Sequence, residues 1–163
     1  MDSIDVVIRL VVATALGAAL GLEREYDGQD AGFRTHVLLV LGSALFAVAS
    51  VTGFDAFRHD RASTNVSVDV TRIAAYVAPG VGFLGGGAIV KVGVHARGMT
   101  TAASLWTAAA IGVAAGLGLW VGAIATTVLA LFALQALQPI GHLVQEAGRR
   151  RRGRADGPET EGD

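Results

Sequence analysis

The residues best suited to do chemistry in this chain lie close together, between Gly21 and His36. We call this segment, GLEREYDGQDAGFRTH, the charged hinge, because it places charges between two long apolar runs. Its charged residues are Glu23, Arg24, Glu25, Asp27, Asp30 and Arg34, and it ends on His36. Such groups can form ion pairs, hold a cation or present a docking surface. The elements around the hinge decide which of these applies.

The composition is that of a membrane protein. Of the 163 residues 52% are hydrophobic and only 17% are charged, whereas about a quarter are charged in soluble domains. No charged residue occurs between Ile73 and Val90 or between Gly98 and Gln145. Since a membrane-spanning helix needs about 20 apolar residues, we predict an all-α integral membrane protein. The chain has no cysteine, which excludes disulfides and cysteine nucleophiles.

The apolar runs predict about five transmembrane helices. Their expected ranges are 4–22, 35–54, 71–90, 100–116 and 119–138. The run from Gly98 to Gln145 contains two of them, because a single helix would extend about 70 Å, more than twice the hydrocarbon thickness. We therefore expect a transmembrane domain over residues 1–145.

The remaining residues, 146–163, form an arginine-rich tail without an apolar face, which predicts disorder. Five spans place the two ends of the chain on opposite sides of the membrane. The arginines of the tail favour a cytoplasmic C-terminus and an N-terminus outside. The charged hinge and the polar link at 91–99 then share the cytoplasmic face.

The third predicted span is rich in residues that break helices or bring them close. These are Pro79, Gly80, Gly82, Gly85, Gly86 and Gly87. Proline removes a backbone donor, and glycine lets a neighbouring helix approach. The preferred interpretation is a glycine-lined packing surface. The alternative is a broken helix whose free carbonyl groups line an ion path.

Two further polar features stand at the ends of predicted spans. Asp5 and Arg9 are four residues apart near the start of the first span, so they share a helix face. We interpret them as an interfacial ion pair, with a functional intramembrane pair as the alternative. At the start of the fourth span, Thr100 or Thr101 is the expected N-cap.

Several interpretations of the charged hinge stay open. We prefer an ion-pair lattice in which the acids meet Arg24, Arg34, Lys91 and Arg97, because unpaired charges at a membrane boundary are costly. Glu25 and Asp27 are weak candidates for magnesium ligands, and His36 with Glu23 is a weaker candidate pair for a transition metal. A third interpretation is a docking surface for a protein or an anion. No catalytic motif is present, so we expect neither an enzyme nor a resident cofactor.

Three segments of the chain together resemble the signature blocks of the MgtC/SapB family. They are the charged hinge, DVTRIAAYVAPGVGFLGGGAIV at 69–90 and RGMTTAASLWTAAAIGVAAGLG at 97–118. The resemblance covers essentially all of residues 5–138. It implies a bacterial inner-membrane protein with about five spans. The best-known members add a cytoplasmic ACT-type domain after the fifth span, which we expect this chain to lack.

The resemblance places the motif residues of the family on numbered positions. They are Glu23, Arg24, Glu25, Gly32, Arg34, Thr35, His36, Asp69, Arg72, Gly82, Phe83, Leu84, Gly85, Gly87, Arg97, Gly98, Thr100, Thr101 and Trp106. Three positions depart from the pattern: Val70 replaces a usual proline, Tyr76 a common glutamine and Pro79 a small residue. All three departures lie in the second block.

The resemblance also implies a function. Family members are associated with growth under magnesium limitation and with survival inside macrophages, and they resemble regulators of other membrane proteins, including the rotary ATP synthase. We therefore expect as partners membrane lipid, a second copy of the chain and another membrane protein such as ATP synthase or a transporter, and no nucleic acid. The alternative is a transporter or channel for magnesium or another small ion through the third predicted span.

Overall fold

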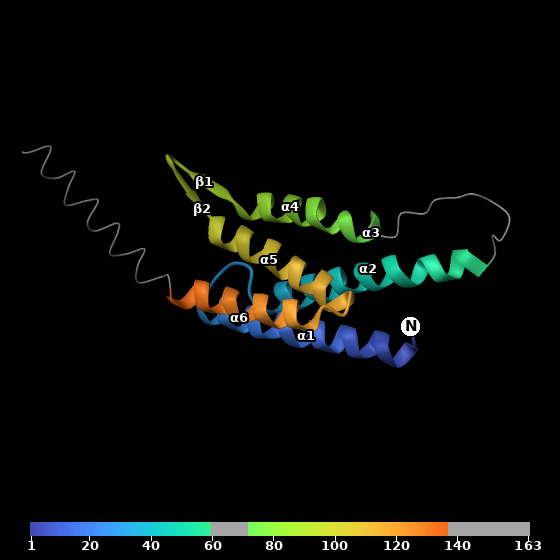
Figure 1. Ribbon diagram of the computed structural model, residues 1–163. Coiled ribbons are helices and arrows are strands. Elements are labelled where there is room, and N and C mark those ends of the chain that lie inside the picture. Colours follow the sequence, from blue (N-terminus) through green and yellow to red (C-terminus); the bar gives the residue numbers. More distant parts are fainter. Residues whose placement is uncertain (60–71, 137–163) are drawn as a thin grey trace, which may run out of the picture. The chain divides into compact units, whose positions relative to one another are not determined.

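The computed structural model describes residues 1–59 and 72–136, and it confirms the all-α class (Figure 1). The helices are α1 (Ser3–Tyr26), α2 (Phe33–His59), α3 (Arg72–Ala75), α4 (Val77–Ala88), α5 (Met99–Gly116) and α6 (Trp120–Ala136). Two short strands, β1 (Val90–Val92) and β2 (His95–Arg97), join α4 to α5. The expected tail at 146–163 and the motif residue Asp69 lie outside the described residues.

Three of the described helices are long and apolar enough to cross a membrane. They cover Ser3–Tyr26, Phe33–Gly53 and Met99–Gly116. The helix α6, with 17 residues, is a shorter apolar helix. The predicted third span is divided into α3 and α4 at Tyr76. The protein is thus an all-α membrane protein, and the number of crossings and the side of each end stay predictions.

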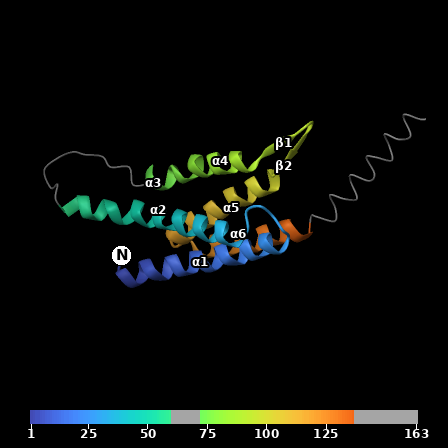
Figure 2. The same ribbon diagram turned by 180° about the vertical axis from the view of Figure 1, so that it is seen from behind.

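Helices α1, α2 and α5 pack against one another, and α4 packs on α5 (Figures 1 and 2). Glycine makes these contacts close. A Cβ atom on Gly17 of α1 would lie 2.9 Å from the Cβ of Val40 in α2. A Cβ atom on Gly112 or Gly116 of α5 would overlap a backbone carbonyl oxygen of α2, that of Val40 or Ala44. Backbones this close are typical of membrane helices, where small residues allow dense packing in place of a hydrophobic driving force.

The interruption between α3 and α4 is confined to one residue. Pro79 has no N–H to donate to the carbonyl of Ala75, the usual effect of proline within a helix. On either side the helical pattern persists, because the N–H of Tyr76 donates to the carbonyl of Arg72 and the N–H of Gly80 to that of Tyr76, both at 3.2 Å. The predicted break is present and small.

Most glycines of α4 face open space within this single chain. Gly85 is the exception, since a Cβ atom there would lie 3.5 Å from Ala102 of α5. At the other four, Gly80, Gly82, Gly86 and Gly87, an added Cβ atom would meet nothing within 4 Å. The preferred interpretation as a packing surface therefore describes Gly85 inside the chain. The remaining glycines have open space beside them, in which the chain itself places no atom within 4 Å.

The polar link expected at 91–99 forms an antiparallel hairpin, with Val90 paired to Arg97. Its turn begins at Gly93, whose φ is 62°. Gly98 follows with a φ of 84° and is the N-cap of α5, so the prediction that Thr100 or Thr101 caps this helix was wrong. Only glycine fits at the N-cap position, because a Cβ atom on residue 98 would overlap the carbonyl oxygen of Ala88.

The close packing of α2 and α5 leads to a stability prediction. We expect Gly112→Ala to lower the unfolding midpoint in mild detergent by about 5 °C, because its methyl group overlaps the Val40 carbonyl and overpacking is destabilising. Circular dichroism during heating measures this. The matched control is Gly122→Ala on α6, where an added Cβ atom meets nothing within 4 Å. Equal melting of the two variants would contradict the packing described here.

Candidate functional site

The charged hinge buries an arginine. The side chain of Arg24 is 2% exposed and that of Glu23 is 6% exposed. The Nε atom of Arg24 donates to Oε2 of Glu23 at 2.8 Å, and its Nη2 atom donates to Oδ2 of Asp27 at 3.3 Å. A buried guanidinium is stable only when its donors and its charge are matched. The hinge therefore holds Arg24 between two carboxylates near the end of α1.

Glu25 caps the N-terminus of the next helix, α2. Its Oε2 atom accepts a hydrogen bond of 2.8 Å from the backbone N–H of Phe33, the first residue of α2. The first N–H groups of a helix lack intrahelical partners, and a negative charge is favourable there. Gly32 makes room for this contact, because a Cβ atom at residue 32 would overlap the Glu25 carboxylate.

His36 connects the hinge to α5. The imidazole is fully buried, with Nδ1 2.9 Å from the carbonyl oxygen of Gly32 and Nε2 3.3 Å from Oγ of Ser104. Because a carbonyl group only accepts, Nδ1 carries a proton. Ser104 in turn donates to the carbonyl of Thr101 at 2.8 Å, and the Thr101 hydroxyl reaches Oε1 of Gln29 at 3.4 Å. This polar network joins α2, α5 and the loop after α1.

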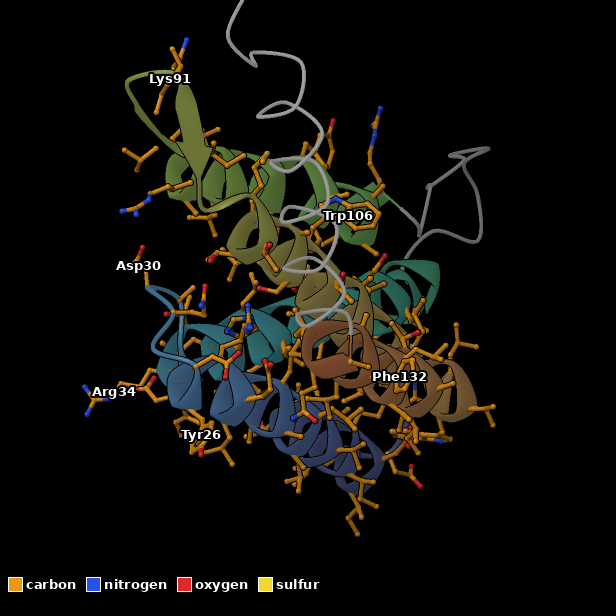
Figure 3. The ribbon with its side chains drawn as sticks, turned by 90° about the vertical axis from the view of Figure 1, so that its left-hand side faces the viewer. Tyr26, Asp30, Arg34, Lys91, Trp106 and Phe132 are labelled. Atoms are coloured by element: carbon orange, nitrogen blue, oxygen red, sulfur yellow. The ribbon has the colours of Figure 1, made fainter. Side chains whose placement is uncertain are left out.

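The predicted ion-pair lattice appears only in its buried part. Arg24 is enclosed with its carboxylate partners, whereas Arg34, Lys91 and Arg97 are exposed. Figure 3 shows Arg34 and Lys91 pointing away from the helices, and Lys91 stands well apart from Arg34. The charged hinge and the hairpin do lie at the same end of the bundle (Figures 1 and 2). We call this end the hinge end.

The metal candidates have protein partners in the structure. Glu25 binds the start of α2 and Asp27 binds Arg24. Both ring nitrogens of His36 face protein oxygen atoms. Within residues 1–59 and 72–136, no three His, Cys, Asp or Glu side chains are grouped so that they could hold a metal ion. A magnesium ion at Glu25 and Asp27 would have to compete with these protein partners, and the magnesium hypothesis stays a prediction.

A second polar cluster lies at the opposite end of the bundle. Arg9 forms the predicted pair with Asp5, with Nη2 and Oδ2 3.1 Å apart. Its Nη1 atom also donates to the carbonyl of Gly116, at 2.8 Å, and its guanidinium lies 5.9 Å from the ring centre of Trp120. An arginine at a helix C-terminus is favourable, so Arg9 ties α1 to the turn between α5 and α6.

The remaining predicted site residues are distributed over both ends. Thr35 and Thr100 are exposed near the hinge, whereas Thr101 is buried in the network. Arg72 is exposed at the start of α3. Sequence reasoning missed Gln29 and Ser104. Their signal was weak, namely one amide in a charged loop and one hydroxyl in an apolar helix.

The comparison with family models decides the family. The model described as the MgtC family matches residues 10–143. This chain belongs to the MgtC family. Its buried network and its hinge both fall within the matched range.

Curated relatives agree with this assignment. The chain is 41% identical over 135 residues to YhiD of Escherichia coli K12, whose name gives magnesium transport as a candidate role. It is 38% identical over 128 residues to the protein MgtC of Salmonella typhimurium, and 38% identical over 137 residues to an uncharacterized protein of Synechocystis.

These alignments cover 82%, 78% and 84% of this chain but only 61%, 50% and 54% of the relatives. This MgtC-family chain thus spans about half to three fifths of their length. No solved structure matches it.

Burial of Arg24 leads to a second prediction. We expect Arg24→Ala to destabilise the protein by about 3–5 kcal/mol, because it leaves Glu23 buried without its partner. Arg24→Met combined with Glu23→Gln should recover part of this loss. Denaturant unfolding in detergent measures both, with the exposed Arg34→Ala as the matched control. If Arg24→Ala unfolds no more readily than Arg34→Ala, the buried pair has no structural role.

The capping role of Glu25 can be tested by a double-mutant cycle. We expect Glu25→Ala and Gly32→Ala each to cost about 1 kcal/mol, because either change removes the same hydrogen bond to Phe33. The double variant should then be about as stable as either single variant. Additive losses in unfolding experiments would show that the two residues act independently.

Proposed function

We propose that this chain is a non-enzymatic regulatory protein of the bacterial inner membrane that acts by docking on other membrane proteins. Membership of the MgtC family and the name of the Escherichia coli relative support a magnesium-related role, and we propose that this role is adaptation to low magnesium. The proposed partners are ATP synthase or a transporter, and a role in virulence is part of the same proposal. The observation that supports it is that the hinge end has two sets of charged residues, one buried and paired within the chain and the other exposed.

At this end the buried and the exposed charges have separate tasks. Arg24, Glu23 and His36 are enclosed and hydrogen-bonded within the chain, so they stabilise the fold. Arg34 and Lys91 point outward from the same end (Figure 3). A rigid base with outward charges suits recognition of a partner, because exposed charges contribute specificity and association rate.

Self-association is part of the proposal. The uncovered glycine positions of α4, Gly82 and Gly86 among them, stand four residues apart with open space beside them. Small residues at this spacing are typical of contacts between membrane helices. Phe83 between them is 83% exposed. We propose that a second copy of the chain covers this face.

The second candidate function is transport of magnesium or another small ion. It is favoured by the interruption at Tyr76, since broken helices often form ion sites in transporters, and by the name of the Escherichia coli relative. However, Gly82, Gly86 and Gly87 of α4 have no neighbour within 4 Å of an added Cβ atom in this chain. A path beside α4 would therefore need a second copy to enclose it.

A partner-recovery experiment tests the docking proposal. We expect a tagged wild-type chain, purified in mild detergent from its host after magnesium starvation, to retain a stoichiometric membrane protein. Arg34→Ala should lose that protein, because it removes an outward charge from the docking end. Asp2→Asn, which changes an exposed charge at the opposite end, is the matched control and should retain it.

Recovery of the same partner with Arg34→Ala would contradict docking through the hinge. Mass spectrometry identifies the retained protein in each sample. If the wild-type chain retains none, magnesium flux into liposomes becomes the decisive measurement. A flux that Pro79→Ala and Gly82→Leu abolish would then establish the transport function instead.

A further inference from the structure

An apolar groove runs along the outside of the bundle between α2 and the α3–α4 segment. Its volume is about 550 Å³, within the range of about 300–1,000 Å³ for small-molecule sites. Gly42 and Phe46 line it from α2, and Tyr76, Gly80 and Leu84 line it from α3–α4. The two glycines make the groove deep, because an added Cβ atom at either would meet nothing within 4 Å.

A positive charge stands at one end of this groove. Tyr76, Gly80 and Leu84 follow each other at four-residue spacing, so they share one helix face. Arg72 begins the same row, and the hydrogen bond from the N–H of Tyr76 to the Arg72 carbonyl keeps the helical spacing between them. Arg72 is exposed. Tyr76 lines the groove, and Arg72 lies one helical turn before it, next to the lining residue Ile73. The helical row therefore brings an exposed guanidinium close to the end of the groove.

The length of the groove matches one leaflet of a bilayer. From Ile73 to Leu84 its wall extends about 16 Å at 1.5 Å per residue. The hydrocarbon core is about 30 Å thick, so one leaflet is about half of that. Arginine and tyrosine are typical of the membrane interface. With Arg72 at the level of the headgroups, a groove of this length reaches about the middle of the membrane.

We propose that this groove is a binding site for one phospholipid, with an acyl chain lying between α2 and α4 and the phosphate paired with Arg72. The combination of an apolar channel of one leaflet's length and a cation at its mouth fits an amphipathic anion. A partner helix would not need the cation. The proposal is independent of the regulatory function, because it concerns the groove between α2 and α3–α4 and the charge of Arg72, and not the outward charges of the hinge end.

The groove can be filled without disturbing the described packing. Gly80→Leu places a side chain inside the groove, and so does Gly42→Leu from the facing helix. Gly122→Leu on α6 is the matched control, since an added Cβ atom there also meets nothing within 4 Å and Gly122 is not part of the groove lining. Arg72→Ala removes the charge and leaves the channel open.

Native mass spectrometry of the full-length chain in mild detergent measures binding directly. We titrate palmitoyl-oleoyl phosphatidylglycerol against diacylglycerol that has the same acyl chains. The wild-type chain and Gly122→Leu should bind one phosphatidylglycerol, with about five-fold preference over diacylglycerol. Arg72→Ala should bind both lipids equally, and Gly80→Leu should lose at least ten-fold in affinity for both.

Two results would overturn the proposal. One is unchanged phosphatidylglycerol binding by Gly80→Leu or, if that variant does not fold, by Gly42→Leu. The other is conversion of a dimer to a monomer by Gly80→Leu with lipid binding retained, which would make the groove a contact between copies. An equal loss of lipid binding in Gly122→Leu would likewise remove the assignment to this groove. None of these results depends on recovery of a regulatory partner at the hinge end.

Discussion

The fold depends on the burial of one guanidinium near the end of a membrane helix. Arg24 is nearly inaccessible, and its charge is matched by carboxylates on the same helix and at its C-cap. An unmatched charge in such a place would cost several kcal/mol. Both carboxylates lie within three residues of Arg24. The charge of Arg24 is therefore neutralised by α1 and its C-cap, without a partner from another helix. Other hinge residues, such as Glu25, can therefore contact the start of α2.

Further polar contacts fasten the hinge to the neighbouring helices. Glu25 holds the first N–H group of α2, and His36 reaches Ser104 on α5. Each polar group that is buried here finds a partner at the place where helices meet. A similar device operates at the other end, where Arg9 binds the last carbonyl of α5. The two ends are fastened by polar contacts, and the middle is packed through glycine and alanine.

The α3–α4 segment is the exception to this pattern. It packs on α5 through Val81 and Gly85, while most of its other residues are exposed. Pro79 weakens it locally, and its glycines leave space on the outer face and in the groove toward α2. The exposed surface of such a segment is available for contact with lipid, with a second copy or with a partner. The regulatory proposal and the lipid site therefore concern different surfaces of one molecule.

The sequence by itself established the all-α membrane class, because long uncharged runs admit no other solution in a bilayer. It also located the cluster of charged residues in the hinge and identified the Asp5–Arg9 pair, since both depend on neighbours within a few residues. The family resemblance was readable from the same segments. These are local properties, and local spacing is visible in a sequence.

Only the tertiary structure decided which charges are buried and which are exposed. Arg24 and Arg34 are the same residue type in one hinge, yet one is enclosed and the other points outward. The contact of His36 with Ser104 joins residues that are far apart in the chain, so no local pattern could reveal it. Gly98 capped α5 in place of a threonine because the Ala88 carbonyl lies beside it. Close approach between distant segments is a property of packing, which the order of residues alone does not display.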